Sequence, residues 1–96
     1  MRKITEQSIN AFNKNKAFKK QNMEVSIVAG STYLILHDNI IAIKEESGDL
    51  FIKTCGWQSN TTKERLNALD GVSICQKNFE WYLNGKKWDG KIIQIK

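Results

Sequence analysis

The stretch that decides the fold runs from residue 23 to residue 54 and reads MEVSIVAGSTYLILHDNIIAIKEESGDLFIKT. It begins with alternation, because Met23, Val25 and Ile27 are separated by polar residues. Such alternation is typical of a strand with one buried face. Turn-forming residues then divide the stretch at three points, Gly30-Ser31, Asp38-Asn39 and residues 45–49. Residues 22–54 are therefore predicted to form a meander of antiparallel strands, because tight turns cannot join parallel neighbours.

A helix is predicted after the meander, over residues 60–70. Thr61 and Glu64 have the spacing of a capping box, in which each side chain bonds the other's backbone N–H. The buried contacts and the end of this helix are expected at Leu66, Leu69 and Asp70-Gly71.

Residues 72–96 have the pattern of hairpin strands. Asn84-Gly85 and Asp89-Gly90 are strong turn signals, and Lys77-Asn78 is a weaker one. Between these turns, Trp81 and Leu83 alternate with Tyr82, so Tyr82 is expected on the opposite face of its strand.

The first helix is predicted over residues 5–18, inside a basic N-terminal region that spans residues 1–20. Thr5 or Ser8 would cap it, and its buried stripe would come from Ile9, Phe12 and either Ala17 or Phe18. The order is then α-β-β-β-β-α-β-β-β. This order predicts an α+β fold in one domain over residues 1–96, a curved antiparallel sheet of about 5–7 strands carrying two helices.

Composition narrows the class of protein. The 96 residues are 41% hydrophobic and 26% charged, as in soluble globular domains. No apolar run approaches the roughly 20 residues of a membrane span. No apolar signal-peptide core follows the basic N-terminus. A cytosolic protein without membrane contact is expected.

Residues suited to catalysis or metal binding are few. His37 is the single histidine, so a four-ligand zinc set is not expected. A nucleophilic pair of His37 with Cys55 or Cys75 lacks an evident orienting group. Both cysteines alternate with core positions and are expected to be reduced, buried thiols. We therefore expect no catalytic residues, no metal and no cofactor.

The net charge of +5 belongs to the first twenty residues, which hold six cations and one acid. Four of the cations are candidates for nucleic-acid binding, Lys14, Lys16, Lys19 and Lys20. A basic terminal helix can bind nucleic acid or an acidic partner, or it can simply be solvated.

The start of the predicted helix at 60–70 is a candidate anion site. Free N–H groups and the positive end of the dipole meet there, and both suit a phosphate. Trp57 lies just before it and can stack on a base or fill the core. The remaining candidates here are Thr61, Thr62, Lys63 and Arg65. Lys63 and Arg65 add positive charge where the dipole disfavours it, which a ligand phosphate would relieve. The two threonines can equally be caps alone.

A second group of candidates lies between residues 81 and 90. Tyr82 tends outward, and Trp88 sits between two turns beside Lys86 and Lys87. Aromatic rings beside cations suit a nucleotide base and its phosphate. Trp88 can equally close a small core. We predict Tyr82, Lys86 and Trp88 as ligand-binding residues.

Several motifs together resemble a widespread family of small tailed-bacteriophage proteins. They are Asn60-Thr61-Thr62-Lys63-Glu64-Arg65-Leu66-Asn67, Gly71-Val72-Ser73-Ile74, Trp81-Tyr82-Leu83-Asn84-Gly85 and Trp88-Asp89-Gly90. The likeness extends to Phe18-Lys19-Lys20 and Asn22 and covers nearly the whole chain. It implies an accessory protein that acts in the cytoplasm of an infected bacterium.

Two functions follow as hypotheses. The first is a non-enzymatic sponge that sequesters a cyclic di- or oligonucleotide signal, as anti-CBASS proteins do, within a homo-oligomer whose subunits share the site. The second is an inhibitor, such as an anti-CRISPR, that binds a host defence protein or nucleic acid through the basic N-terminal helix. A virion or assembly component is a third alternative.

Overall fold

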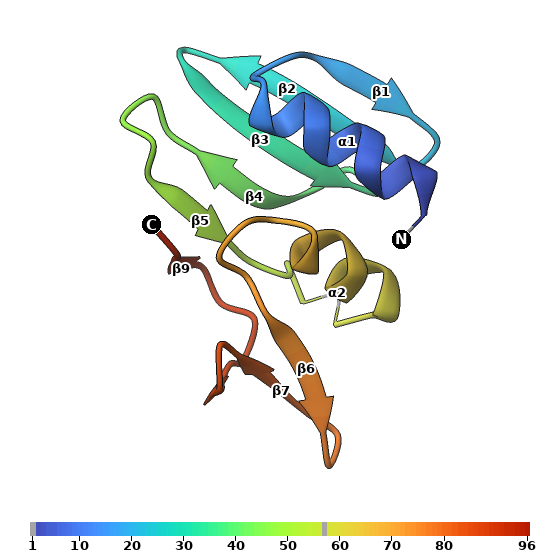
Figure 1. The fold of residues 1–96 in the computed structure, drawn as a ribbon, viewed down its shortest axis with the longest axis vertical. Helices are drawn as coiled ribbons and strands as arrows, with labels where there is room; N and C mark the ends of the chain where they lie inside the picture. Colours follow the sequence, from blue (N-terminus) through green and yellow to red (C-terminus); the bar gives the residue numbers. More distant parts are fainter. Residues whose placement is uncertain (1, 57) are drawn as a thin grey trace.

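The computed structural model describes residues 2–56 and 58–96 and shows two helices lying against antiparallel strands (Figure 1). The described residues form six strands in one sheet, in the order β1-β2-β3-β4-β5-β9, and three in another, β6-β7-β8. The elements are α1 (Lys3–Asn13), β1 (Phe18–Lys20), β2 (Met23–Val28), β3 (Ser31–Leu36), β4 (Asn39–Lys44), β5 (Leu50–Ile52), α2 (Asn60–Asn67), β6 (Ile74–Lys77), β7 (Glu80–Leu83), β8 (Lys86–Lys87) and β9 (Ile93–Gln94). The predicted α+β class is confirmed.

The core lies between one face of the six-stranded sheet and the two helices. Val25, Leu34, Ala42 and Ile52 follow one another across four strands and are all buried. Phe12 of α1 covers them and is 1% exposed. Burial of these side chains is the main force holding α1 on the sheet.

The β3–β4 hairpin turns one residue earlier than predicted. His37 and Asp38 occupy the turn, both with positive φ, at 49° and 64°. Two positive φ values match the twist of the flanking strands. Asn39 therefore pairs with Leu36 as the first residue of β4. A bulge follows, because Ile35 pairs with Ile40 whereas Leu34 pairs with Ala42. The extra residue, Ile41, is buried.

The first helix begins earlier and ends earlier than predicted. Neither Thr5 nor Ser8 caps it, since both are fully buried inside α1. The helix ends where Asn15 adopts a φ of 55°, and the N–H of Lys16 bonds the carbonyl of Ala11 at 2.9 Å. This is a Schellman ending, with Asn in the place usually held by Gly. Residues 18–20 are therefore free to form β1, which was not predicted; the predicted helix over 5–18 included Phe18.

The second helix is capped by Ser59, not by Thr61. The hydroxyl of Ser59 accepts a 3.2 Å hydrogen bond from the N–H of Thr62. Glu64 does not complete a capping box, because its carboxylate accepts hydrogen bonds from Thr5 and Arg65. The helix gives way to turns after Asn67, three residues before the predicted end.

The small sheet packs its tryptophans inward. Trp81 and Trp88 are 4% and 7% exposed, and their ring centroids lie 6.5 Å apart. The predicted turn at Asn84-Gly85 is confirmed, with both residues at positive φ. The turn predicted at Lys77-Asn78 falls on Asn78-Phe79 instead, with φ values of 52° and 65°.

The chain returns from the small sheet to the large one through a tight contact at Gly90. The carbonyl of Gly90 accepts a 3.0 Å hydrogen bond from the N–H of Thr54. Gly90 has a φ of +90°, and a Cβ there would lie 2.3 Å from the Thr54 hydroxyl. Only glycine fits both conditions. Beyond this contact β9 pairs with β5, so the predicted last strand completes the large sheet.

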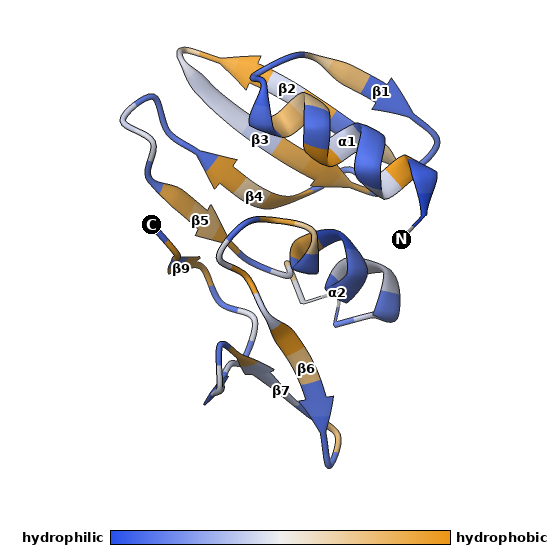
Figure 2. Cartoon of the chain, in the orientation of Figure 1, coloured by the Kyte–Doolittle hydropathy of each residue, from blue (hydrophilic) through white to orange (hydrophobic). Residues whose placement is uncertain are grey.

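Figure 2 shows that β4, β5 and the end of β3 are hydrophobic, whereas α1 carries hydrophobic and hydrophilic bands and α2 is largely hydrophilic. Helix α1 packs on strands β1, β2 and β3, and helix α2 packs on strands β4 and β6. Both helices lie on the face that carries the core. Within residues 2–56 and 58–96, no helix covers the apolar residues on the other face of these strands.

Candidate functional site: a cavity at the start of α2

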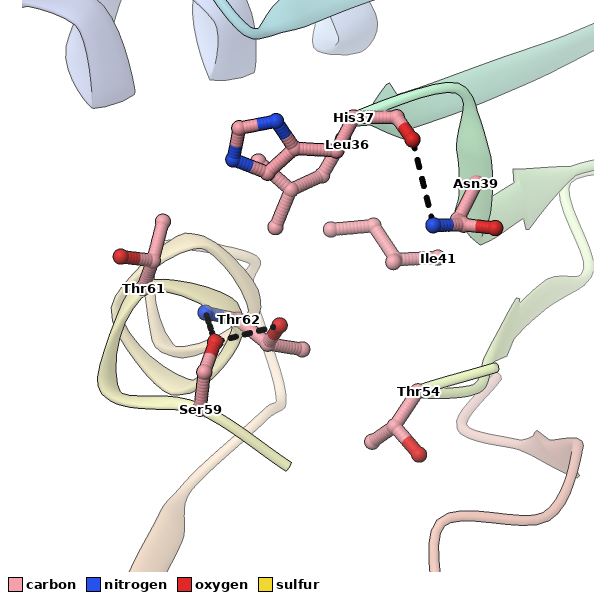
Figure 3. Close-up of a pocket in the computed structure, with 8 residues that line it drawn as sticks. All are labelled: Leu36, His37, Asn39, Ile41, Thr54, Ser59, Thr61 and Thr62. Atoms are coloured by element: carbon pink, nitrogen blue, oxygen red, sulfur yellow. Dashed lines mark hydrogen bonds between the residues drawn. The ribbon is translucent and has the colours of Figure 1, made fainter. Parts of the chain in front are cut away.

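A cavity of about 290 Å³ lies between the β3–β4 turn and the first turn of α2. Figure 3 shows its eight lining side chains, with His37, Asn39 and Ile41 on the sheet side and Ser59, Thr61 and Thr62 on the helix side. Leu36 and Thr54 complete the lining. We call it the α2 cavity. It combines an apolar floor with hydroxyl groups at a helix N-terminus, the arrangement expected for a small polar ligand.

Ser59 organises the helix side of the α2 cavity. The Ser59 hydroxyl accepts a hydrogen bond from the N–H of Thr62 and also lies 3.1 Å from the Thr62 hydroxyl. The Thr62 side chain is only 1% exposed, so it stiffens the rim more than it offers a binding group. Thr61 is half-buried and lines the cavity directly. Of the two predicted threonines, Thr61 is the one placed to meet a ligand.

Arg65 is not an open anion-binding residue. It is 1% exposed, and its guanidinium donates to the Thr5 hydroxyl at 2.6 Å and to the Glu64 carboxylate. Burial lowers the pKa of Arg65, and the charge of Glu64 opposes that shift. The prediction of Arg65 as a phosphate ligand is therefore corrected: this cation joins the two helices. No local sequence pattern indicates this contact, because Thr5 and Arg65 are 60 residues apart.

The other residues predicted around the helix start fall into two groups. Lys63 is half-buried but is not part of the cavity lining. Trp57 lies outside the described residues, so its predicted stacking role has no structural counterpart here.

The aromatic candidates near the C-terminus lie in the small sheet or just after it, and neither lines the α2 cavity. The indole N–H of Trp88 donates to the carbonyl of Lys91 at 2.9 Å, and the ring packs beside Trp81. Trp88 therefore belongs to the core, which corrects its prediction as an open stacking residue. Trp88 also lines an open hollow of about 560 Å³ together with residues of β7 and β8. Tyr82 is half-buried, and Lys86 is exposed on β8. The structure does not gather these residues around one ligand with Thr61.

The four basic candidates do not lie on a helix. Lys14 and Lys16 follow the end of α1, and Lys19 and Lys20 belong to β1. All four are exposed. The predicted basic helix is therefore corrected: Lys19 and Lys20 lie on the edge strand of the six-stranded sheet, and Lys14 and Lys16 lie in the segment before it. We call these four lysines together the basic edge. The prediction of buried cysteines is also wrong, because Cys55 and Cys75 are both exposed.

Sequence reasoning missed most of the cavity lining. His37 and Asn39 come from the β3–β4 turn and the start of β4, which are distant in sequence from α2. Thr54 is closer in sequence but lies just after β5, in a segment without a recognised motif. Ser59 carried a usable signal, since a serine three residues before a helical Thr62 is a normal cap. The competing Thr61–Glu64 spacing obscured it.

The fold and the cavity together define a small α+β domain with a hollow between a hairpin turn and a helix start. The chain belongs to the Kyanoviridae Gp96 protein family of tailed phages, whose family model matches residues 1–94. The phage origin implied by the resemblance is thereby confirmed. No curated protein and no solved structure matches the chain. Neither described helix is long and apolar enough to cross a membrane.

Proposed function

We propose that this phage protein is a non-enzymatic binding protein that sequesters an anionic nucleotide signal in the host cytoplasm, with the α2 cavity as its site. The α2 cavity is the observation that supports this proposal. The Thr61 hydroxyl and the positive end of the α2 dipole suit a phosphate group. The apolar side chains of Leu36 and Ile41 suit the face of a nucleotide base. His37 and Asn39 add polar groups on the facing turn.

The volume of the α2 cavity limits the ligand. At about 290 Å³ it lies at the lower end of the range for small-molecule sites. A single nucleotide, or one nucleotide unit of a larger cyclic signal, is the matching size. The site proposed here therefore uses Thr61, His37 and Asn39, and it leaves out Arg65 and Trp88.

Calorimetry with mononucleotides, cyclic mononucleotides, cyclic dinucleotides and inorganic phosphate tests the proposal. Asn39→Asp places a negative charge in the cavity lining and should weaken binding about tenfold. Asn78→Asp makes the same change at the exposed β6–β7 turn and serves as the control. The proposal fails if no nucleotide binds more tightly than about 1 mM, or if both variants weaken binding equally.

A second candidate function rests on the basic edge. Lys19 and Lys20 lie on the edge strand β1, and Lys14 and Lys16 lie in the segment just before it. All four are exposed, so they can contact nucleic-acid phosphates or an acidic host protein. Replacing Lys14, Lys16, Lys19 and Lys20 by Glu should abolish RNA or DNA binding, and wild-type binding should fall steeply with salt. Nucleotide binding in the α2 cavity should survive this variant, which separates the two functions.

A further inference from the structure

One edge of the six-stranded sheet has a step. Strand β1 pairs with β2 only from Phe18, which lies opposite Val25, to Lys20. Strand β2 continues to Val28 and pairs with β3 along its whole length. Residues 26–28 therefore have β3 on one side and, within residues 2–56 and 58–96, no strand on the other. We call residues 26–28 the β2 step.

The backbone of Ile27 points to the open side of the β2 step. In an antiparallel pair, successive residues direct their N–H and C=O groups alternately to the two sides of the strand. The N–H of His37 bonds the carbonyl of Asn22 at 2.9 Å, in register with the β2–β3 pairs. The even-numbered residues of β2 therefore bond β3, so Val25 faces β1 and Ile27 faces the open side. In the part of the chain that the structure describes, no backbone group bonds Ile27 from that side.

The surroundings of the β2 step leave room for a further strand. An open hollow of about 510 Å³ lies beside it and is lined by residues of both β1 and β2. Ile27 and Val28 are apolar but 40% and 57% exposed, and they form the hydrophobic end of β2 in Figure 2. Pairing of an extended peptide with an open strand edge, called β-augmentation, gains affinity from backbone hydrogen bonds and specificity from side chains.

Positive charge lies close to the β2 step. The hydroxyl of Thr32 donates to the side chain of Asn15 at 2.9 Å, and Thr32 pairs with Ile27. The segment before β1 therefore passes beside the step. The two residues that flank Asn15 in this segment are Lys14 and Lys16, and both are exposed.

Two acids also lie near the β2 step, but they do not cancel this charge. Glu24 lines the hollow and lies directly opposite Lys19 of β1, so these two charges offset each other. Glu46 lies over the β2–β3 turn, where a Cβ at Gly30 would be 2.6 Å from its carboxylate. The three other lysines of the basic edge outnumber Glu46, which leaves a net charge of 3 − 1 = +2.

We propose that the β2 step binds an extended, acidic segment of a partner protein, which adds a strand beside Ile27 in line with β1. This inference rests on the second candidate function and selects its protein form. A polypeptide supplies both the donor and the acceptor that the backbone of Ile27 needs, and apolar side chains to cover Ile27 and Val28. A second copy of the chain is a poor occupant, because lysines on an edge strand keep like edges apart.

A designed peptide tests the chemistry of the partner. The probe has eight residues of alternating Glu and Val, and the control peptide has Lys in place of Glu. Fluorescence anisotropy measures the binding of each peptide to the full chain. We expect a dissociation constant of about 100 μM for the acidic peptide and binding at least about tenfold weaker for the basic one.

Hydrogen exchange tests the backbone pairing directly. The N–H of Val25 is covered by β1 and should exchange slowly in the free chain, whereas the N–H of Ile27 should exchange fast. The acidic peptide should slow exchange at Ile27 at least about tenfold and leave Val25 unchanged. This measurement needs no substitution.

Substitutions at Ile27 separate backbone pairing from other contacts. Ile27→Pro removes the N–H on the open side and no bond to β3, and it should weaken binding of the acidic peptide at least about tenfold. Ile27→Glu should weaken it similarly by charge repulsion, without a change in backbone chemistry. Ile27→Val keeps the N–H and the apolar surface, so this control should change binding less than about twofold. Circular dichroism verifies the fold of each variant.

Charge substitutions test the contribution of the lysines. The double variant Lys14→Glu with Lys16→Glu should weaken binding of the acidic peptide about tenfold. The control is Lys86→Glu with Lys91→Glu, which makes the same change in net charge in and after the small sheet and should leave binding nearly unchanged.

Four results would overturn the proposal: no binding of the acidic peptide at about 1 mM, equal binding of the two peptides, unchanged exchange at Ile27 with peptide bound, or equal binding by all three Ile27 variants. A chain that binds single-stranded RNA but not the acidic peptide would also refute it, and would leave the nucleic-acid form of the second candidate function standing. The proposed nucleotide site is tested separately, because no residue of the β2 step lines the α2 cavity.

Discussion

The guanidinium of Arg65 in α2 donates a 2.6 Å hydrogen bond to the hydroxyl of Thr5 in α1, and Glu64 bonds both residues. Arg65 is 1% exposed, whereas the Glu64 side chain is 34% exposed. If the ion pair is broken, the Glu64 carboxylate can therefore be solvated by water, whereas the Arg65 guanidinium stays buried without a charged partner.

This asymmetry predicts that Glu64→Gln destabilises the fold more than Arg65→Met. Removing the carboxylate leaves a buried, uncompensated cation and should lower the free energy of unfolding by about 2–4 kcal/mol. Replacing the cation by a methionine of similar volume should cost less than about 1.5 kcal/mol. Urea denaturation measures both, with Glu6→Gln on the exposed face of α1 as control. Equal losses of unfolding free energy in Glu64→Gln and Arg65→Met would contradict the prediction, because they would show that the buried charge of Arg65 carries no extra cost when Glu64 is removed.

Trp88 should behave as a core residue. Trp88→Phe removes the 2.9 Å bond to Lys91 and leaves a small void, so it should lower the free energy of unfolding by about 1–3 kcal/mol. Phe79→Ala, at a 97% exposed aromatic, should change it by less than about 0.5 kcal/mol. Guanidinium denaturation makes the comparison. A negligible effect of Trp88→Phe on the free energy of unfolding would contradict the core role and favour Trp88 as an open stacking residue.

Asn67 ties the end of α2 to the small sheet. Its amide donates to the carbonyl of Ile74 at 3.0 Å and accepts from the N–H of Ile74 at 2.6 Å. Asn67→Ala loses both bonds and should cost about 2 kcal/mol, while Asn67→Asp keeps the acceptor and should cost about half as much. Thermal unfolding measures the difference. Asn10→Ala, exposed in α1, is the matched control and should be neutral or stabilising.

The exposed pair of Glu80 and Lys87, with 2.7 Å between carboxylate and ammonium, predicts a pH effect. The hydrogen bond and the charge of Lys87 lower the pKa of Glu80 below its usual value of 4.5. The pair therefore stabilises the folded state above that usual value, and the contribution is lost as the pH falls through the lowered pKa.

Carboxyl NMR titration checks this directly. Lys87→Met should raise the pKa of Glu80 toward 4.5, and Lys86→Met should leave it unchanged because Lys86 pairs with Leu83 on the other face of β7. Equal shifts in the two variants would indicate a general effect of net charge.

Local patterns were sufficient for the fold class and for most strands. Alternation of apolar and polar residues over 23–28 and the Asn84-Gly85 turn are properties of adjacent residues, so the sequence carries them. The site depended on contacts between distant segments. Arg65 was taken for an open cation because nothing near it in sequence indicates Thr5. The Asn15 ending of α1 was missed because asparagine marks helix ends less strongly than glycine, and the basic residues were assigned to the wrong element in consequence.

The close approach of Gly90 to Thr54 has an evolutionary consequence. A smaller residue at 54 would remove the clash but not the strain of a left-handed backbone, so position 90 cannot be rescued by compensating change nearby. Relatives of this protein should therefore keep glycine at this position while the exposed turns around it diverge. A homologue with another residue there would have to join its two sheets along a different path.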